Sequence, residues 1–144
     1  MATYNKFQDF SEQLTRGVHD WDLHVFKVAL TDTAPVATQT TWNITDHPAP
    51  VAANGYTAGG TATTISISEV TGTTTVQGTQ VVFTATAGGI GPFRYAILYN
   101  DSATSPADAA VAWWDNGSSI TLNDTQTFTV KFNNATPGTI WTLV

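Results

Sequence analysis

The chain has 144 residues, of which only 11% are charged, and its five basic residues leave a formal net charge of −6. Because neutralising phosphates needs clustered Lys or Arg, these scattered bases argue against a nucleic-acid partner. The chain has no cysteine, which excludes disulfides and thiolate zinc sites. No apolar run approaches the ~20 residues that span a bilayer, and the amphipathic N-terminus does not resemble a signal peptide. We therefore expect one domain that folds in the cytoplasm and has no membrane partner.

The first residues predict a short helix. Phe7, Phe10 and Leu14 recur at spacings of three and four between positions 4 and 17, and Gly17 suits the position after a helix end. We expect residues 1–20 to form an N-terminal helical arm and residues 21–144 to form the β domain. The helix could cap an open end of the β core, or dock on a neighbouring subunit or another protein.

Residues 21–30 alternate with both faces largely apolar, which is typical of an interior strand. A polar loop at 32–41 and a brief strand at 42–45 are expected to follow. Residues 47–60 contain prolines, glycines and Asn54–Gly55, which exclude regular structure for most of the segment. A loop of this length is usually functional, and Tyr56 is the residue best suited to anchor it on a partner.

Four alternating segments predict further strands, at residues 61–69, 73–77, 80–87 and 127–132. In the first of them we expect Ile65 and Ile67 to point inward. The C-terminal segment 138–144 (GTIWTLV) is apolar to its end, so we expect it to pair as a strand, either within the chain or on a neighbour.

The segment 92–132 is predicted to be the centre of the fold. Residues 92–99 are apolar on both faces, as in a strand between two layers, and a polar loop is expected at 101–108. Asn116–Gly117 between two extended runs predicts a hairpin turn, because a type I′ turn needs positive φ at both central residues. Eight or nine short strands separated by turn signals indicate an all-β antiparallel sandwich, jelly-roll-like, with a short N-terminal helix.

Few residues suggest chemistry. Asp20, Asp22 and His24 would lie on one face of an extended strand and could hold a divalent cation, although polar groups at a strand edge are commoner. No G-x-S-x-G motif is present, and Glu12 and Glu69 lie in no recognisable catalytic context. We expect no enzyme activity, no catalytic residue, no metal and no cofactor.

Trp113 and Trp114 are adjacent, so in a strand they point to opposite faces and at most one belongs to a single core. The other must be covered by a loop or second sheet, by another subunit, or by a ligand such as a sugar ring. These three alternatives remain open from the sequence.

Four runs of residues resemble a family of small β-rich virion proteins of tailed bacteriophages: HVFKVALTDTAPVA, NGYTAGG, GPFRYAILYNDSATSPAD and WWDNGSSITLNDTQTFTVKF. The resemblance covers residues 6–132 and departs from the family pattern at residues 109–112 and in the C-terminal tail. It implies a non-enzymatic capsid cement or decoration protein that binds the major capsid protein on the outer surface of the virion, usually as a trimer. The alternatives are a tail protein (tube, terminator or fibre-associated) and a carbohydrate-binding β-sandwich.

If the chain works by contact, its apolar ends and unpaired aromatic residues are the expected interface. The predicted contact residues are Tyr4, Phe7, Phe10, Tyr56, Trp113, Trp114, Trp141, Leu143 and Val144.

Overall fold

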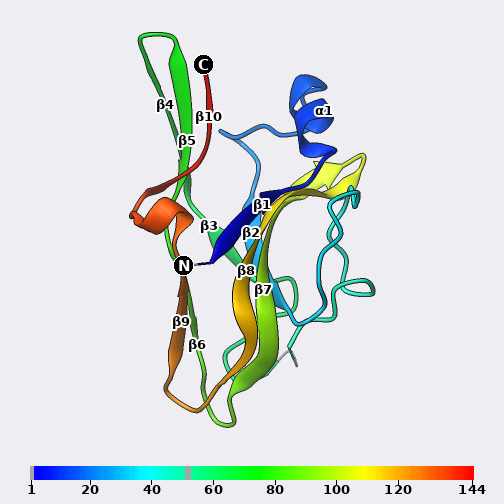
Figure 1. Ribbon diagram of the computed structural model, residues 1–144, viewed down its shortest axis with the longest axis vertical. Coiled ribbons are helices and arrows are strands. Elements are labelled where there is room, and N and C mark those ends of the chain that lie inside the picture. The colour runs from blue at the N-terminus through cyan, green and yellow to red at the C-terminus, as the bar shows by residue number, and fades with distance from the viewer. Residues whose placement is uncertain (1, 51–52) are drawn as a thin grey trace.

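The computed structural model describes residues 2–50 and 53–144 and is shown in Figure 1. The described part of the chain is mostly β, with a single short α-helix, which confirms the expected all-β, sandwich-like class. The elements are β1 (Thr3–Lys6), α1 (Phe10–Thr15), β2 (Phe26–Thr31), β3 (Thr61–Thr63), β4 (Ile65–Val70), β5 (Thr73–Gly78), β6 (Val81–Thr84), β7 (Ile90–Thr104), β8 (Ala107–Leu122), β9 (Thr127–Val130), the 3-10 helix η1 (Phe132–Asn134) and β10 (Gly138–Leu143).

The strands form three antiparallel sheets. The largest has the order β1-β8-β7-β2-β3, and the two smaller sheets are β10-β5-β4 and β6-β9. Side chains from the smaller sheets pack in one cluster with side chains of β2, β7 and β8, so together they form the second layer of the sandwich. Figure 1 shows the long curved strands β7 and β8 at the centre, with the β4–β5–β10 sheet extending past the rest of the molecule at one end.

Strand β7 is buried on both faces, as the sequence predicts. Ala96 and Leu98 belong to the larger core cluster, between the two layers. Ile97 and Tyr99 belong to a second cluster on the opposite face, where Trp42 stacks on Tyr99 with ring centroids 4.6 Å apart. The second cluster is thus covered by the loop that follows β2 and not by a sheet.

The Asn116–Gly117 hairpin prediction is wrong. Strand β8 is continuous through both residues, and the β7–β8 hairpin turns instead at Ser105–Pro106, inside the segment expected to be a loop. Of the pair, only Gly117 has a positive φ (+89°), whereas a type I′ turn needs two such residues.

Residues 116–119 form a wide bulge in β8. Phe93 pairs with Ile120 and Tyr95 pairs with Asp115, so β7 advances by two residues (93 to 95) while β8 advances by five (120 to 115). The irregularity also changes which face each side chain occupies: Phe93 lies in the larger cluster, and Ile97, of the same parity, lies in the smaller one. A single alternating pattern over residues 93–99 could not predict this change.

The N-terminal helix is shorter than expected. Thr3–Lys6 is strand β1, which pairs with β8 in the register Tyr4 to Trp114, and only Phe10–Thr15 is helical. Strand pairing satisfies backbone groups that a marginal helix would leave to water, and Thr and Tyr favour strands. Gly17, with φ +73°, ends the helix as predicted. The segment expected to be a helical arm therefore begins as an edge strand of the largest sheet.

The predicted strand at 21–30 begins only at Phe26. Residues 21–24 form a turn in which the Asp20 carboxylate accepts the backbone N–H groups of Asp22 and Leu23, each at 3.0 Å. Trp21 folds back and stacks on Phe26 with centroids 4.1 Å apart. Local hydrogen bonding by Asp has overridden the apolar alternation here. The brief strand expected at 42–45 is likewise absent, and Trp42 instead packs in the second core cluster.

Buried His19 joins the helical segment to β7. Its Nε2 lies 3.1 Å from the Gln13 Oε1 atom, and its Nδ1 lies 3.2 Å from the Asn100 side-chain amide. A neutral imidazole satisfies both contacts, by donating to Gln13 and accepting from Asn100. Burial, together with repulsion from His24, lowers the pKa of His19 to about 4 from 6.5.

This lowered pKa predicts acid sensitivity. Between pH 6.5 and about 4 the unfolded chain binds a proton at His19 and the folded chain does not, so the stability is full above pH 6.5 and falls as the pH is lowered. The loss should reach roughly 3 kcal/mol below pH 4. Urea unfolding of wild type and His19→Gln across this range should give a flatter pH dependence for the variant. Equal pH dependence would show that His19 is not the group responsible.

Candidate functional site

Three predicted contact residues are buried inside the chain's own core. Phe7 belongs to the smaller cluster, whereas Phe10 and Tyr56 belong to the larger one. The Tyr56 hydroxyl accepts the Leu30 N–H at 2.9 Å, and burial raises the pKa of Tyr56 to about 12. The expectation that these residues contact a partner is corrected: they hold the N-terminal segment and the 53–60 segment against the sheets.

Trp113 and Trp114 point to opposite faces of β8, as adjacent strand residues must. Trp114 lies in the larger cluster beside Phe132, with ring centroids 5.3 Å apart. Trp113 is half-buried and packs on Phe7 at 4.5 Å. Of the three alternatives left open, the chain's own segments cover most of both rings, and Trp114 is only 9% exposed.

Tyr4, Trp114 and Trp141, which are far apart in the sequence, line one cavity of about 400 Å³. The cavity lies between β1 and β8 on one side and η1 and β10 on the other. A second cavity of about 230 Å³ shares Trp114 and Lys131 with it and continues to Arg94 and Phe128. We call the two adjoining cavities the interlayer groove, because they follow the opening between the two layers at the β1 edge.

The groove is lined by aromatic, amide and basic side chains. Tyr4 is 44% exposed and lies 5.6 Å from the Trp114 ring, and partial burial raises its pKa. Lys131 and Arg94 supply the charges, and no Asp or Glu lines either cavity. Arg94 is ion-paired with Asp115, so it is the charge of Lys131 that favours a partner surface with negative charge.

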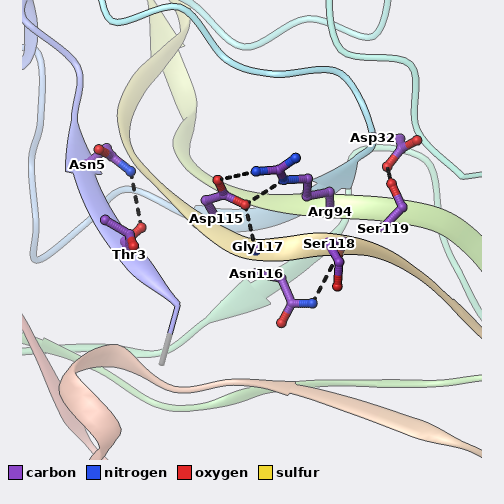
Figure 2. A network of polar contacts seen from close by, with 9 residues as sticks. All are labelled: Thr3, Asn5, Asp32, Arg94, Asp115, Asn116, Gly117, Ser118 and Ser119. Carbon is purple, nitrogen blue, oxygen red and sulfur yellow. Dashed lines mark hydrogen bonds and ion pairs between the residues drawn. The ribbon is translucent and has the colours of Figure 1, made fainter.

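Arg94 is held at the groove by the bulge in β8. Its guanidinium donates two hydrogen bonds to Asp115, at 2.7 and 2.9 Å, and Asp115 also accepts the Gly117 N–H at 2.7 Å. Figure 2 shows this network, in which Ser119 of the same bulge also contacts Asp32. The hydrogen bonds from Arg94 and from Gly117 hold the pKa of Asp115 below its usual value.

The β4–β5–β10 sheet, which we call the projecting sheet, carries the other exposed apolar residues. Ile67, Val76 and Trp141 are in register and therefore share a face, which is buried at Val76. Ile67, on the terminal strand β4, is 47% exposed, and Leu143, nearer the end of the sheet, is 58% exposed. The expectation that Ile67 is buried in the core is therefore wrong: it shares the face of Val76, but it lies on the outer strand of the sheet.

The C-terminal strand is paired within the chain, in register with β5. Ile140 is buried and Trp141 packs edge-on to Phe10 and Trp21, so the first half of β10 belongs to the core. Leu143 and Val144 extend beyond it and are exposed. Of the predicted contact residues, Tyr4, Trp141, Leu143 and Val144 thus retain surface that a partner could reach.

Some groove residues carry no signal in the sequence. Lys131 reads as the wet face of a strand, and Asn133 and Asn134 read as loop residues, yet they line the groove. Both asparagines have positive φ. Asn adopts this conformation more readily than most residues, but the preference does not predict that these residues line a groove.

The residues considered for metal binding do not assemble. Asp20 is engaged with backbone amides in a turn, and within residues 2–50 and 53–144 no group of three His, Asp or Glu side chains could hold a metal ion. No helix in the same described residues has the length and apolar character needed to cross a bilayer.

Comparison of the chain with protein-family models, with curated proteins and with solved structures gives no significant match. The function is therefore argued from the residues and geometry above, together with the resemblance noted in the sequence.

The Asp115 network gives a direct prediction. Replacing Arg94 with Met removes the two donated hydrogen bonds, so the pKa of the Asp115 carboxyl should rise toward 3.8 while the Gly117 N–H continues to stabilise its charged form. An NMR titration of the side-chain carboxyl carbons measures this change. An unchanged Asp115 pKa in the variant would contradict the assigned cause.

Proposed function

We propose that the chain is a non-enzymatic structural protein of a bacteriophage virion. Its most direct role is that of a capsid cement or decoration protein, which binds the major capsid protein on the outer surface and stabilises the head as a trimer. The resemblance of residues 6–132 to small phage virion proteins suggests this setting. The single observation that carries the proposal is the projecting sheet, with exposed apolar residues at its end.

The projecting sheet supports a contact function for a physical reason. Ile67 and Leu143 are exposed on one face of the sheet and Val70 on the other, and residues 65–78 contain only one ionisable side chain, Glu69. Apolar surface of this kind gains free energy when a partner removes it from water. A standard interface buries about 800 Å² per partner, and several linked contacts in a trimer would slow release.

A tail position remains the alternative within the virion, and copy number separates the two. A capsid cement is present in numbers comparable to the capsid sites, whereas most tail parts are present in few copies. The carbohydrate alternative gains little support, since Trp114 is nearly buried and Trp113 is half covered by Phe7.

The proposal predicts that capsid binding depends on Ile67 and Leu143. The double variant Ile67→Ser, Leu143→Ser should bind capsids that lack this protein at least about tenfold more weakly, because two apolar anchors are lost. The matched control is Val36→Ser, since Val36 is 56% exposed but lies in the loop after β2. Co-sedimentation with capsids measures binding, and circular dichroism checks the fold.

Point substitutions are preferable to removing residues 138–144, because that deletion would also take Ile140 and Trp141 out of the core. If the double variant binds capsids as tightly as wild type, the projecting sheet is not the contact. If wild-type protein sediments with tails and not with heads, the capsid location is wrong.

A further inference from the structure

Both edges of the projecting sheet are open. Strands β4 and β10 are its terminal strands, and across the described residues no backbone hydrogen bond joins either outer edge to another strand. Open edges are normally protected by Lys, Pro or a bulge, since unpaired N–H and C=O groups recruit another strand. The outer strand β4 (ISISEV) has no proline, no lysine and a single charge. Such an edge is suited to pair with a strand of another chain.

The open edge of β10 borders the interlayer groove. Strand β10 has a bulge at Ile140, and beyond it Trp141 and Thr142 point to opposite faces, yet residues 139–142 all line the larger cavity. The backbone edge of β10 therefore forms part of the wall. On the opposite wall lie Ala2 and Tyr4, next to or within β1, the terminal strand of the largest sheet. The groove thus separates the terminal strands of two sheets, where a further strand would fit.

Charge indicates which strand fits there. Glu69 is the only charged side chain of the β4–β5 hairpin, and its Oε1 accepts the Gly72 N–H at 2.6 Å, which fixes the carboxylate at the hairpin tip. Lys131 lines the groove and no acidic residue does, while the other basic residue of the groove, Arg94, is already ion-paired with Asp115. The hairpin of one copy is therefore complementary in charge to the groove of another.

Strand direction agrees with this pairing. Lys131 immediately precedes η1. Strand β10 follows η1 and runs toward the projecting end, and β4 runs toward the hairpin tip (Figure 1). In an antiparallel arrangement, an incoming β4 places its tip at the start of β10. Glu69 of the incoming chain then arrives beside Lys131, whereas a parallel arrangement would leave the two charges at opposite ends.

We propose that β4 of one copy of this chain adds antiparallel to β10 of a second copy and enters its interlayer groove. Backbone hydrogen bonds along the paired edges provide affinity, and the contact between Glu69 and Lys131 sets direction and register. The contact joins two different surfaces. Because β4 and β10 run parallel within one sheet, antiparallel addition turns each copy over relative to the last, and the contact repeats head to tail along a row of subunits. This inference goes beyond the proposed function, since a head-to-tail row uses a different contact from that of the proposed trimer, and it rests on that function only for its setting in the virion.

The test is the association state of the purified full chain in solution, measured by sedimentation equilibrium over a concentration series. Wild type should self-associate, and Lys131→Glu and Glu69→Lys should each raise the dissociation constant at least about tenfold. The double variant Glu69→Lys, Lys131→Glu should regain most of the lost affinity, because the pair is restored with its charges exchanged. Lys6→Glu, which changes an exposed lysine of β1, should associate like wild type.

Two outcomes would overturn the inference: a wild-type chain that stays monomeric throughout the series, or a double variant that associates no better than the single variants. Near-UV circular dichroism of each variant ensures that folded proteins are compared. Because no capsid is present, this result is separate from the capsid-binding test. Association without capsid binding would reject the proposed function alone, whereas capsid binding by a protein whose self-association does not depend on Glu69 and Lys131 would reject this inference alone.

Discussion

The burial of β7 on both faces is the constraint on which the rest of the structure depends. A strand with Ala96 and Leu98 on one face and Ile97 and Tyr99 on the other needs a cover on each side. The two small sheets provide one cover, and the loop after β2, with Trp42 stacked on Tyr99, provides the other. Within residues 2–50 and 53–144, β1 ends the first layer and β10 ends one sheet of the second layer. The groove lies between these two terminal strands.

The arrangement of the two layers also explains where apolar side chains remain exposed. One face of the projecting sheet is buried at Val76 on the central strand β5, and it is exposed at Ile67 on the terminal strand β4 and at Leu143 near the end of β10. Natural proteins commonly place charged residues at exposed sheet edges to prevent association, whereas residues 65–78 contain Glu69 as their one charged residue. The groove, by contrast, is lined by two basic residues. These are Arg94, which Asp115 holds in place, and Lys131. An apolar, acidic-tipped element and a basic groove in one chain form a complementary pair of surfaces.

Alternation identified the strands correctly wherever a segment has one or two well-defined faces, as in residues 92–99, 80–87 and 127–132. It failed where a few polar groups decide the local geometry. Residues 21–24 form a turn and not a strand, because the Asp20 carboxylate accepts backbone N–H groups there. Residues 116–117 lie in a bulge and not in a hairpin turn, and the Asp115 carboxylate accepts the Gly117 N–H. Tyr4 and Trp141 were identified as contact residues, but their meeting in one groove depends on sheet order, which strand count does not encode. The prediction that Phe7, Phe10 and Tyr56 contact a partner was wrong. Their burial depends on which segments of the chain pack against them, and the residue type does not encode this.

The central claim is that the free edges of β4 and β10 become paired when copies of the chain associate, and hydrogen exchange measures this most directly. In dilute solution, the outward-facing amides of both strands should exchange rapidly, while those of β7 stay protected. On association, amides of β4 and β10 should gain protection together, with those of β3 and β6 unchanged as an internal reference. Association that protects neither β4 nor β10, or edges already protected in the isolated chain, would contradict the account.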